Sequence, residues 1–86
     1  MKANQIHIRF FASLREAVGC AELVQPLSEA CQAADLLTML ANRKELAAVD
    51  FAERNLLVAI NQQLAGWQDW VTPGDEVAFF PPVTGG

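Results

Sequence analysis

The last eight residues of the chain, residues 79–86, join a stiff segment to a chemically simple tip. Pro81 and Pro82 remove two amide donors and hold the backbone extended after a predicted strand. Gly85 and Gly86 have no side chains, so the tip is thin enough to enter a narrow channel. Its reactive group would be the Gly86 carboxylate, whose ordinary pKa of about 3.3–3.7 leaves it ionised at pH 7. Acyl chemistry at this carbon therefore requires prior activation.

Two terminal glycines alone are more often a frayed end than a functional group. The proline pair changes that interpretation, because a frayed end needs no stiff base. Val83 and Thr84 join the proline pair to the two glycines and complete the tail.

Other residues that could do chemistry lack suitable neighbours. His7 is the single histidine, and the alternation of its strand places it toward solvent with no triad partner. Cys20 and Cys31 lack the spacing of a zinc or redox motif, so no metal site is expected. Asp75 and Glu76 are adjacent and would point to opposite faces of a strand, which does not suit an acid–base pair.

The elements that must position the tail follow from hydrophobic periodicity and turn residues. Ser13 is predicted to cap a short helix that Gly19 ends, and Ser28 to cap the main helix. A second short helix is predicted over residues 43–51. Strands are predicted at residues 5–10, 22–25, 56–60 and 76–80, with an edge strand within residues 62–67 and a type II turn at residues 72–75.

Three apolar residues are predicted on the exposed side of the sheet: Phe11, Leu64 and Phe80. Phe80 alternates with Phe79, and Phe11 is out of phase with the apolar face of its own strand. Exposed aromatic side chains beside the start of the tail would form a patch where a partner protein docks. The central strand at residues 56–60 is expected to be buried on both faces.

Composition limits the class of protein. The 86 residues are enough for one domain, and 52% of them are apolar, so the chain should fold. The net charge of −4, with no basic residue after Arg54, argues against nucleic acid and favours a basic receiving partner. No stretch resembles an export signal or a membrane span, so we expect a cytoplasmic protein with reduced thiols.

The C-terminal octapeptide resembles the end of the small subunit of molybdopterin synthase, a ubiquitin-like sulfur carrier. The similarity extends, in order, to residues 8–12 (IRFFA), 15–16 (RE), 58–62 (VAINQ) and 73–77 (PGDEV). It implies an α+β, β-grasp (ubiquitin-like) roll, in which one main helix crosses a mixed sheet of about five strands. The domain would span residues 1–80 and the extended tail residues 81–86.

The resemblance also implies an activity that the chain does not perform alone. A partner adenylating enzyme, using ATP and magnesium, would activate Gly86, and sulfur would replace the adenylate to give a thiocarboxylate. In the large molybdopterin synthase subunit, the tail would donate sulfur to cyclic pyranopterin monophosphate. The assembly would hold two small and two large subunits, and the chain itself would bind no cofactor.

Two alternatives remain open from sequence. A ubiquitin-like modifier would join Gly86 to lysines of target proteins, although such tails commonly carry basic residues and this one has none. A sulfur carrier for another product, such as thiamine, would use the same terminal chemistry, but such carriers usually lack the proline pair.

Overall fold

The computed structural model describes residues 4–51 and 55–82. Its main sheet has the strand order β2-β1-β7-β4-β5, in which β1 and β7 are parallel and the other neighbours antiparallel. A small antiparallel pair, β3 and β6, lies beside it. In chain order the elements are β1 (Gln5–Phe10), α1 (Ala12–Val18), β2 (Glu22–Pro26), β3 (Cys31–Gln32), α2 (Ala33–Ala41), the 3₁₀ helix η1 (Lys44–Leu46), β4 (Leu57–Ile60), β5 (Gln63–Ala65), β6 (Trp70–Val71) and β7 (Glu76–Phe80).

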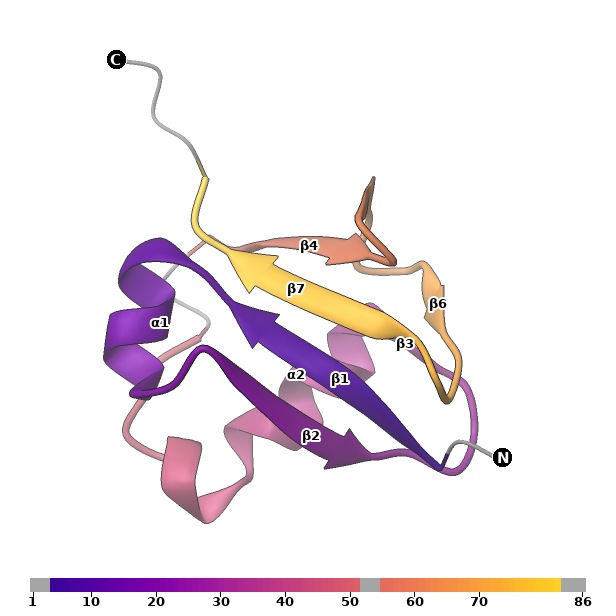
Figure 1. Ribbon diagram of the computed structural model, residues 1–86, viewed down its shortest axis with the longest axis horizontal. Helices are drawn as coiled ribbons and strands as arrows, with labels where there is room; N and C mark the ends of the chain where they lie inside the picture. Colours follow the sequence, from indigo (N-terminus) through magenta and orange to yellow (C-terminus); the bar gives the residue numbers. More distant parts are fainter. Residues whose placement is uncertain (1–3, 52–54, 83–86) are drawn as a thin grey trace.

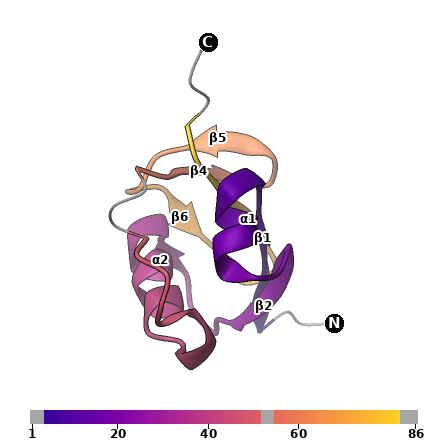
Figure 2. The same cartoon turned by 90° about the vertical axis from the view of Figure 1, so that its left-hand side faces the viewer.

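The helix α2 crosses one face of the sheet, and the core lies between them (Figures 1 and 2). Alternate residues of the central strands point into this core, as the period-two patterns predict. Phe79 stacks between two aromatic rings, with centroids 6.4 Å from Phe10 and 5.9 Å from Trp67. Within the described residues, the largest fully buried side chains are Phe10, Phe79, Ile6, Ile8, Leu14, Leu36, Leu40, Leu46, Val58, Val71 and Val77. The predicted roll, with one main helix across a mixed five-stranded sheet, is confirmed.

The helix starts differ from prediction. Ser13 caps nothing, because α1 follows directly on Phe11 and begins with Ala12 at φ 56°. Ser28 is not the cap of α2 either, since Cys31 and Gln32 first pair with β6 and the helix begins only at Ala33. Both errors concern chain segments whose conformation is set by contacts made elsewhere in the fold.

Two further differences concern the region around β4. Leu57 is 37% exposed, so β4 is buried on one face only, and the prediction of burial on both faces is wrong. The expected helix over residues 43–51 is reduced to η1.

The structure contains the predicted turn at residues 72–75 and, in addition, a tight hairpin loop at residues 61–62. Gly74, at φ 98°, and the Asp75 amide bond to the Thr72 carbonyl (3.0 Å) agree with the type II turn. The hairpin between β4 and β5 has a two-residue loop in which Asn61 and Gln62 both have positive φ, 51° and 71°. Such loops match the twist of the strands they join.

Candidate functional site

The predicted tail begins where β7 ends. Phe80 is the last residue of β7, Pro81 is half-buried and Pro82 is exposed. The rest of the tail, Val83, Thr84, Gly85 and Gly86, lies outside the described residues. Its extended conformation and its role are therefore still predictions.

The outer face of the sheet, meaning the face opposite α2, leads to this tail root. Side chains on this face form rows across neighbouring strands, fixed by the pairing register. One row runs from Arg9 through Ala78 and Ala59 to Leu64. The next row, nearer the tail, pairs Phe80 with Leu57. The face is therefore apolar where β7 ends and becomes charged toward the start of β7.

A hollow of about 340 Å³ lies in this face. Phe11 and Phe80, two of the three predicted docking residues, line it together. Leu64 is 72% exposed and lies opposite Ala59, which also lines the hollow, although Leu64 itself does not. The full lining is Arg9, Phe11, Ala59, Gln62, Glu76, Ala78 and Phe80.

Arg9 and Glu76 are the charged residues in the lining of this hollow, and the sequence did not single out Arg9. Its Nη1 donates to the Glu76 carboxylate at 3.2 Å, and its Cζ lies 5.5 Å from the ring centroid of Phe11. The cation thus lies near an aromatic ring and against a carboxylate, which fixes the direction of its remaining donors. The alternation of β1 would have placed Arg9 on this face, but no short motif marks it.

The hairpin loop and the start of β7 hold one side of the hollow in place. The Asn61 side chain donates from Nδ2 to Asp75 (3.1 Å) and accepts at Oδ1 from the Glu76 amide (3.0 Å). The Asn61 amide also donates to the Glu76 carbonyl (2.8 Å). Gln62 follows this anchored residue, so its place in the hollow lining is set by main-chain geometry.

The side chains set aside as candidates for chemistry behave as ordinary structural groups. His7 is exposed, and its Nε2 lies 3.2 Å from the Glu22 carboxylate. Cys20 and Cys31 are both free thiols. Burial, and to a smaller extent the Asp35 carboxylate, raises the pKa of the Cys31 thiol, which disfavours its reactive thiolate at neutral pH.

Two tryptophans and the lengths of the helices complete the description. Trp67 packs on the core against Phe79, whereas Trp70 is 62% exposed. Over residues 4–51 and 55–82, the longest and most apolar helix falls short of what a bilayer crossing requires.

Comparison with known sequences shows which proteins this chain resembles. Residues 8–86 match the sequence pattern of the ThiS family. The chain is 42% identical over 88 residues to the molybdopterin synthase sulfur carrier subunit of Escherichia coli (strain K12), covering 94% of this chain and 99% of that protein. It is 40% identical to the Haemophilus influenzae protein of the same name, again covering 94% and 99%.

Solved structures support the fold independently. Small archaeal modifier protein 1 of H. volcanii superposes with a TM-score of 0.77 at 23% identity, over 92% of this chain and 98% of that chain. A complex of subunits 1 and 2 of the molybdopterin-converting factor of Helicobacter pylori contains a chain that superposes with a TM-score of 0.63 at 19% identity, over 95% and 99%. At these identities the likeness establishes the β-grasp fold that the sequence predicted.

Proposed function

The chain belongs to the ThiS family, and from this premise we propose that it is the sulfur carrier subunit of a molybdopterin synthase. The observation that carries the proposal is the continuity of two features. The apolar outer face ends at Phe80, and the Pro81-Pro82 segment starts at the next residue. A protein that covers this face would therefore receive whatever follows Pro82.

The chemistry starts from the Gly86 carboxylate, which resists nucleophiles because it is negatively charged at neutral pH. In the proposed route, an adenylating enzyme joins Gly86 to AMP from ATP, with release of pyrophosphate and with magnesium on the nucleotide. A sulfur nucleophile then displaces AMP and leaves a thiocarboxylate. Gly85 and Gly86 suit this step because a side chain beside the acyl carbon would crowd the adenylate.

The large synthase subunit is the proposed receiver of the loaded tail. In support of this, the H. pylori structure is a complex of subunits 1 and 2 of a molybdopterin-converting factor, and one of its chains shares the fold of this protein. In our proposal, Phe11, Leu64 and Phe80 dock on the partner, and residues 81–86 enter its pocket with Val83 and Thr84 at the entrance. The sulfur then passes to cyclic pyranopterin monophosphate, and two such chains serve two large subunits.

Compartment and cofactor use follow from the same chemistry. Adenylation consumes ATP, which places the proposed cycle in the cytoplasm. In that compartment Cys20 and Cys31 would stay as reduced thiols. ATP and magnesium are bound by the activating enzyme, and this chain contributes only its terminal acyl group.

A modifier function is the second candidate, favoured by the likeness to small archaeal modifier protein 1. Both functions begin with an activated Gly86, and they differ in the acceptor. Intact mass of the chain, isolated from cells with the complete pathway, separates them. An increase equal to replacing one oxygen by sulfur supports the carrier, whereas Gly86 joined to lysines of other proteins supports the modifier.

Deletion of Gly86 provides the direct test of the tail. We expect the truncated chain to unfold at the same denaturant concentration as the full chain, because the core ends at Phe79. Its sulfur transfer to cyclic pyranopterin monophosphate should be lost. The matched control is Lys2→Ala, at the opposite end of the chain, which should transfer sulfur normally. Cofactor formation by the truncated chain would refute the assignment of Gly86.

A further inference from the structure

The two edges of the main sheet, β2 and β5, differ in what protects them. At the β2 edge, Arg43 Nη1 donates to the Val24 carbonyl at 3.0 Å. The strand β2 also contains Glu22 and Pro26. Occupied carbonyls, charged side chains and proline all hinder the addition of a further strand. The β5 edge has no such protection, because residues 62–68 contain no charged residue and no proline.

The hydrogen-bonding direction along β4 decides which groups of β5 face outward. The Asn61 amide donates to the Glu76 carbonyl at 2.8 Å, so the main chain of Asn61 faces β7. Its neighbour Ile60 therefore faces β5, where it pairs with Gln63. Since these directions alternate along a strand, the N–H and C=O of the next residue, Leu64, point to the free edge.

Leu64 presents its side chain as well as its main chain. The side chain is 72% exposed and lies opposite Ala59, in the row that crosses the outer face. No turn, loop or side chain among residues 4–51 and 55–82 bonds to the outward N–H and C=O. These two groups are free to pair with the main chain of another protein.

The length of β5 indicates what kind of partner can use this edge. A strand of three residues offers few hydrogen bonds, so edge pairing alone would hold a second chain only weakly. A partner that also covers the adjoining apolar surface at Phe11 and Phe80 gains the additional contact. The protein that receives the tail has to approach this surface, because the tail starts directly after Phe80.

We propose that the large synthase subunit adds an extended strand to β5, and that the N–H and C=O of Leu64 bond to the main chain of that strand. The sheet would then continue across the interface, while the Leu64 side chain contacts the partner on the outer face. This inference rests on the proposed function, because it takes the large subunit as the receiver of the tail.

Hydrogen exchange of main-chain amides is the first test. In a ¹⁵N-labelled chain, we expect the Leu64 amide to exchange with water at least tenfold more slowly after saturation with the unlabelled large subunit. The Val24 amide, on the protected edge, is the internal control and should exchange at the same rate in both states. An unchanged rate at Leu64, or equal slowing at both amides, would overturn the proposal.

A pair of variants separates the main-chain bond from the side-chain contact. Leu64→Ala removes the apolar side chain and keeps the N–H, whereas Leu64→Pro removes both. An outward N–H makes proline tolerable at this position. By calorimetry, Leu64→Pro should bind the large subunit about tenfold more weakly than Leu64→Ala, because one carbonyl of the partner strand loses its donor. Equal affinities of the two folded variants would refute strand pairing, and if Leu64→Pro does not fold, the exchange measurement decides.

A second copy of this chain is the competing occupant of the edge. Sedimentation equilibrium of the isolated chain should give the mass of a monomer. A dimer in which the Leu64 amide already exchanges slowly would overturn the proposal, because the edge would be occupied before the large subunit binds. If the unaltered chain neither binds the large subunit nor carries sulfur, the proposed function fails. If it binds while the Leu64 amide exchanges as fast as before, only this inference fails.

Discussion

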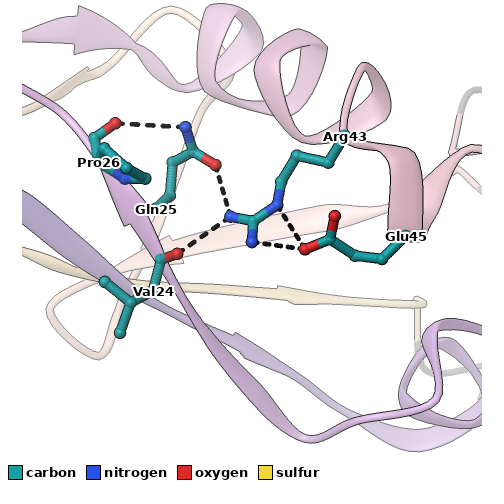
Figure 3. Close-up of polar contacts among 5 residues, drawn as sticks. All are labelled: Val24, Gln25, Pro26, Arg43 and Glu45. Atoms are coloured by element: carbon teal, nitrogen blue, oxygen red, sulfur yellow. Dashed lines mark hydrogen bonds and ion pairs between the residues drawn. The ribbon is translucent and has the colours of Figure 1, made fainter.

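At the scale of single residues, Arg43 shows how one side chain closes an edge of the fold. The bonds Phe10 N to Ala21 O and Leu27 N to Asn4 O place the odd-numbered residues of β2 against β1. The Val24 carbonyl therefore points to the free edge of the sheet, where Arg43 Nη1 donates to it at 3.0 Å (Figure 3). An edge capped in this way is a poor template for another strand.

The same guanidinium bonds two side chains. Nη1 donates to Gln25 Oε1 at 2.9 Å, and Nε and Nη2 donate to the Glu45 carboxylate at 3.0 and 2.6 Å. Local sequence patterns do not single out Arg43, because two of its acceptors, Val24 and Gln25, lie in a strand some twenty residues earlier. Residue roles that depend on such distant acceptors are beyond local pattern analysis.

A pH titration tests this arrangement. The hydrogen bond from Arg43 is the main cause that lowers the pKa of Glu45 below its ordinary value. Any stability from the pair is therefore present at neutral pH and is lost as the pH falls through this lowered pKa. In Arg43→Met, NMR titration of the Glu45 carboxyl carbon should show a higher pKa than in the unaltered chain. Equal values in both proteins would mean that the pair does not form in solution.

At the scale of elements, strands were easier to predict than helix starts. The four main strands were recognised because their alternation reflects a core on one side, and β5 was correctly expected at an edge. The start of α2 was missed because β3 exists only through its pairing with β6, some forty residues later. The position of Phe11 and Phe80 on the outer face followed from the phase of their strands alone, whereas the hollow that they share requires the order of strands in the sheet.

The hairpin between β4 and β5 offers a test at this scale. Gln62 holds φ 71°, a left-handed conformation that costs an L-residue about 1–2 kcal/mol and glycine much less. Gln62→Gly should therefore raise the free energy of unfolding by about 0.5–1 kcal/mol, measured by urea denaturation. Gln63→Gly is the control: Gln63 lies in β5, and glycine there should destabilise the chain. A loss of stability in Gln62→Gly would show that the Gln62 side chain contributes more than the strain costs.

At the scale of the whole molecule, the sheet separates two tasks. One face packs on α2 and stabilises the fold, and the other stays uncovered in the described residues (Figure 2). A domain of this size has no room for an enclosed substrate cavity, so its chemistry must be presented to a partner. The strand β7 joins both tasks, because it lies at the centre of the sheet and leads directly into Pro81.

We therefore expect substitutions of the two adjacent phenylalanines of β7 to have opposite effects on stability and on partner binding. Phe79 is fully buried between Phe10 and Trp67, so Phe79→Ala should lower the free energy of unfolding by about 3–5 kcal/mol. Phe80 lies on the outer face, so Phe80→Asp should cost much less stability while weakening binding to the large synthase subunit at least tenfold.

Denaturation and calorimetry on the same two variants check both halves of this prediction. Binding should be measured below the unfolding midpoint of Phe79→Ala, where the folded fraction of that variant retains an intact outer face and should bind normally. His7→Asp is the control for Phe80→Asp, because it adds an acidic group to the outer face away from the hollow lining. If Phe80→Asp bound as tightly as the unaltered chain, the uncovered face of the sheet would not be the docking surface, and the tail would have to be received without it.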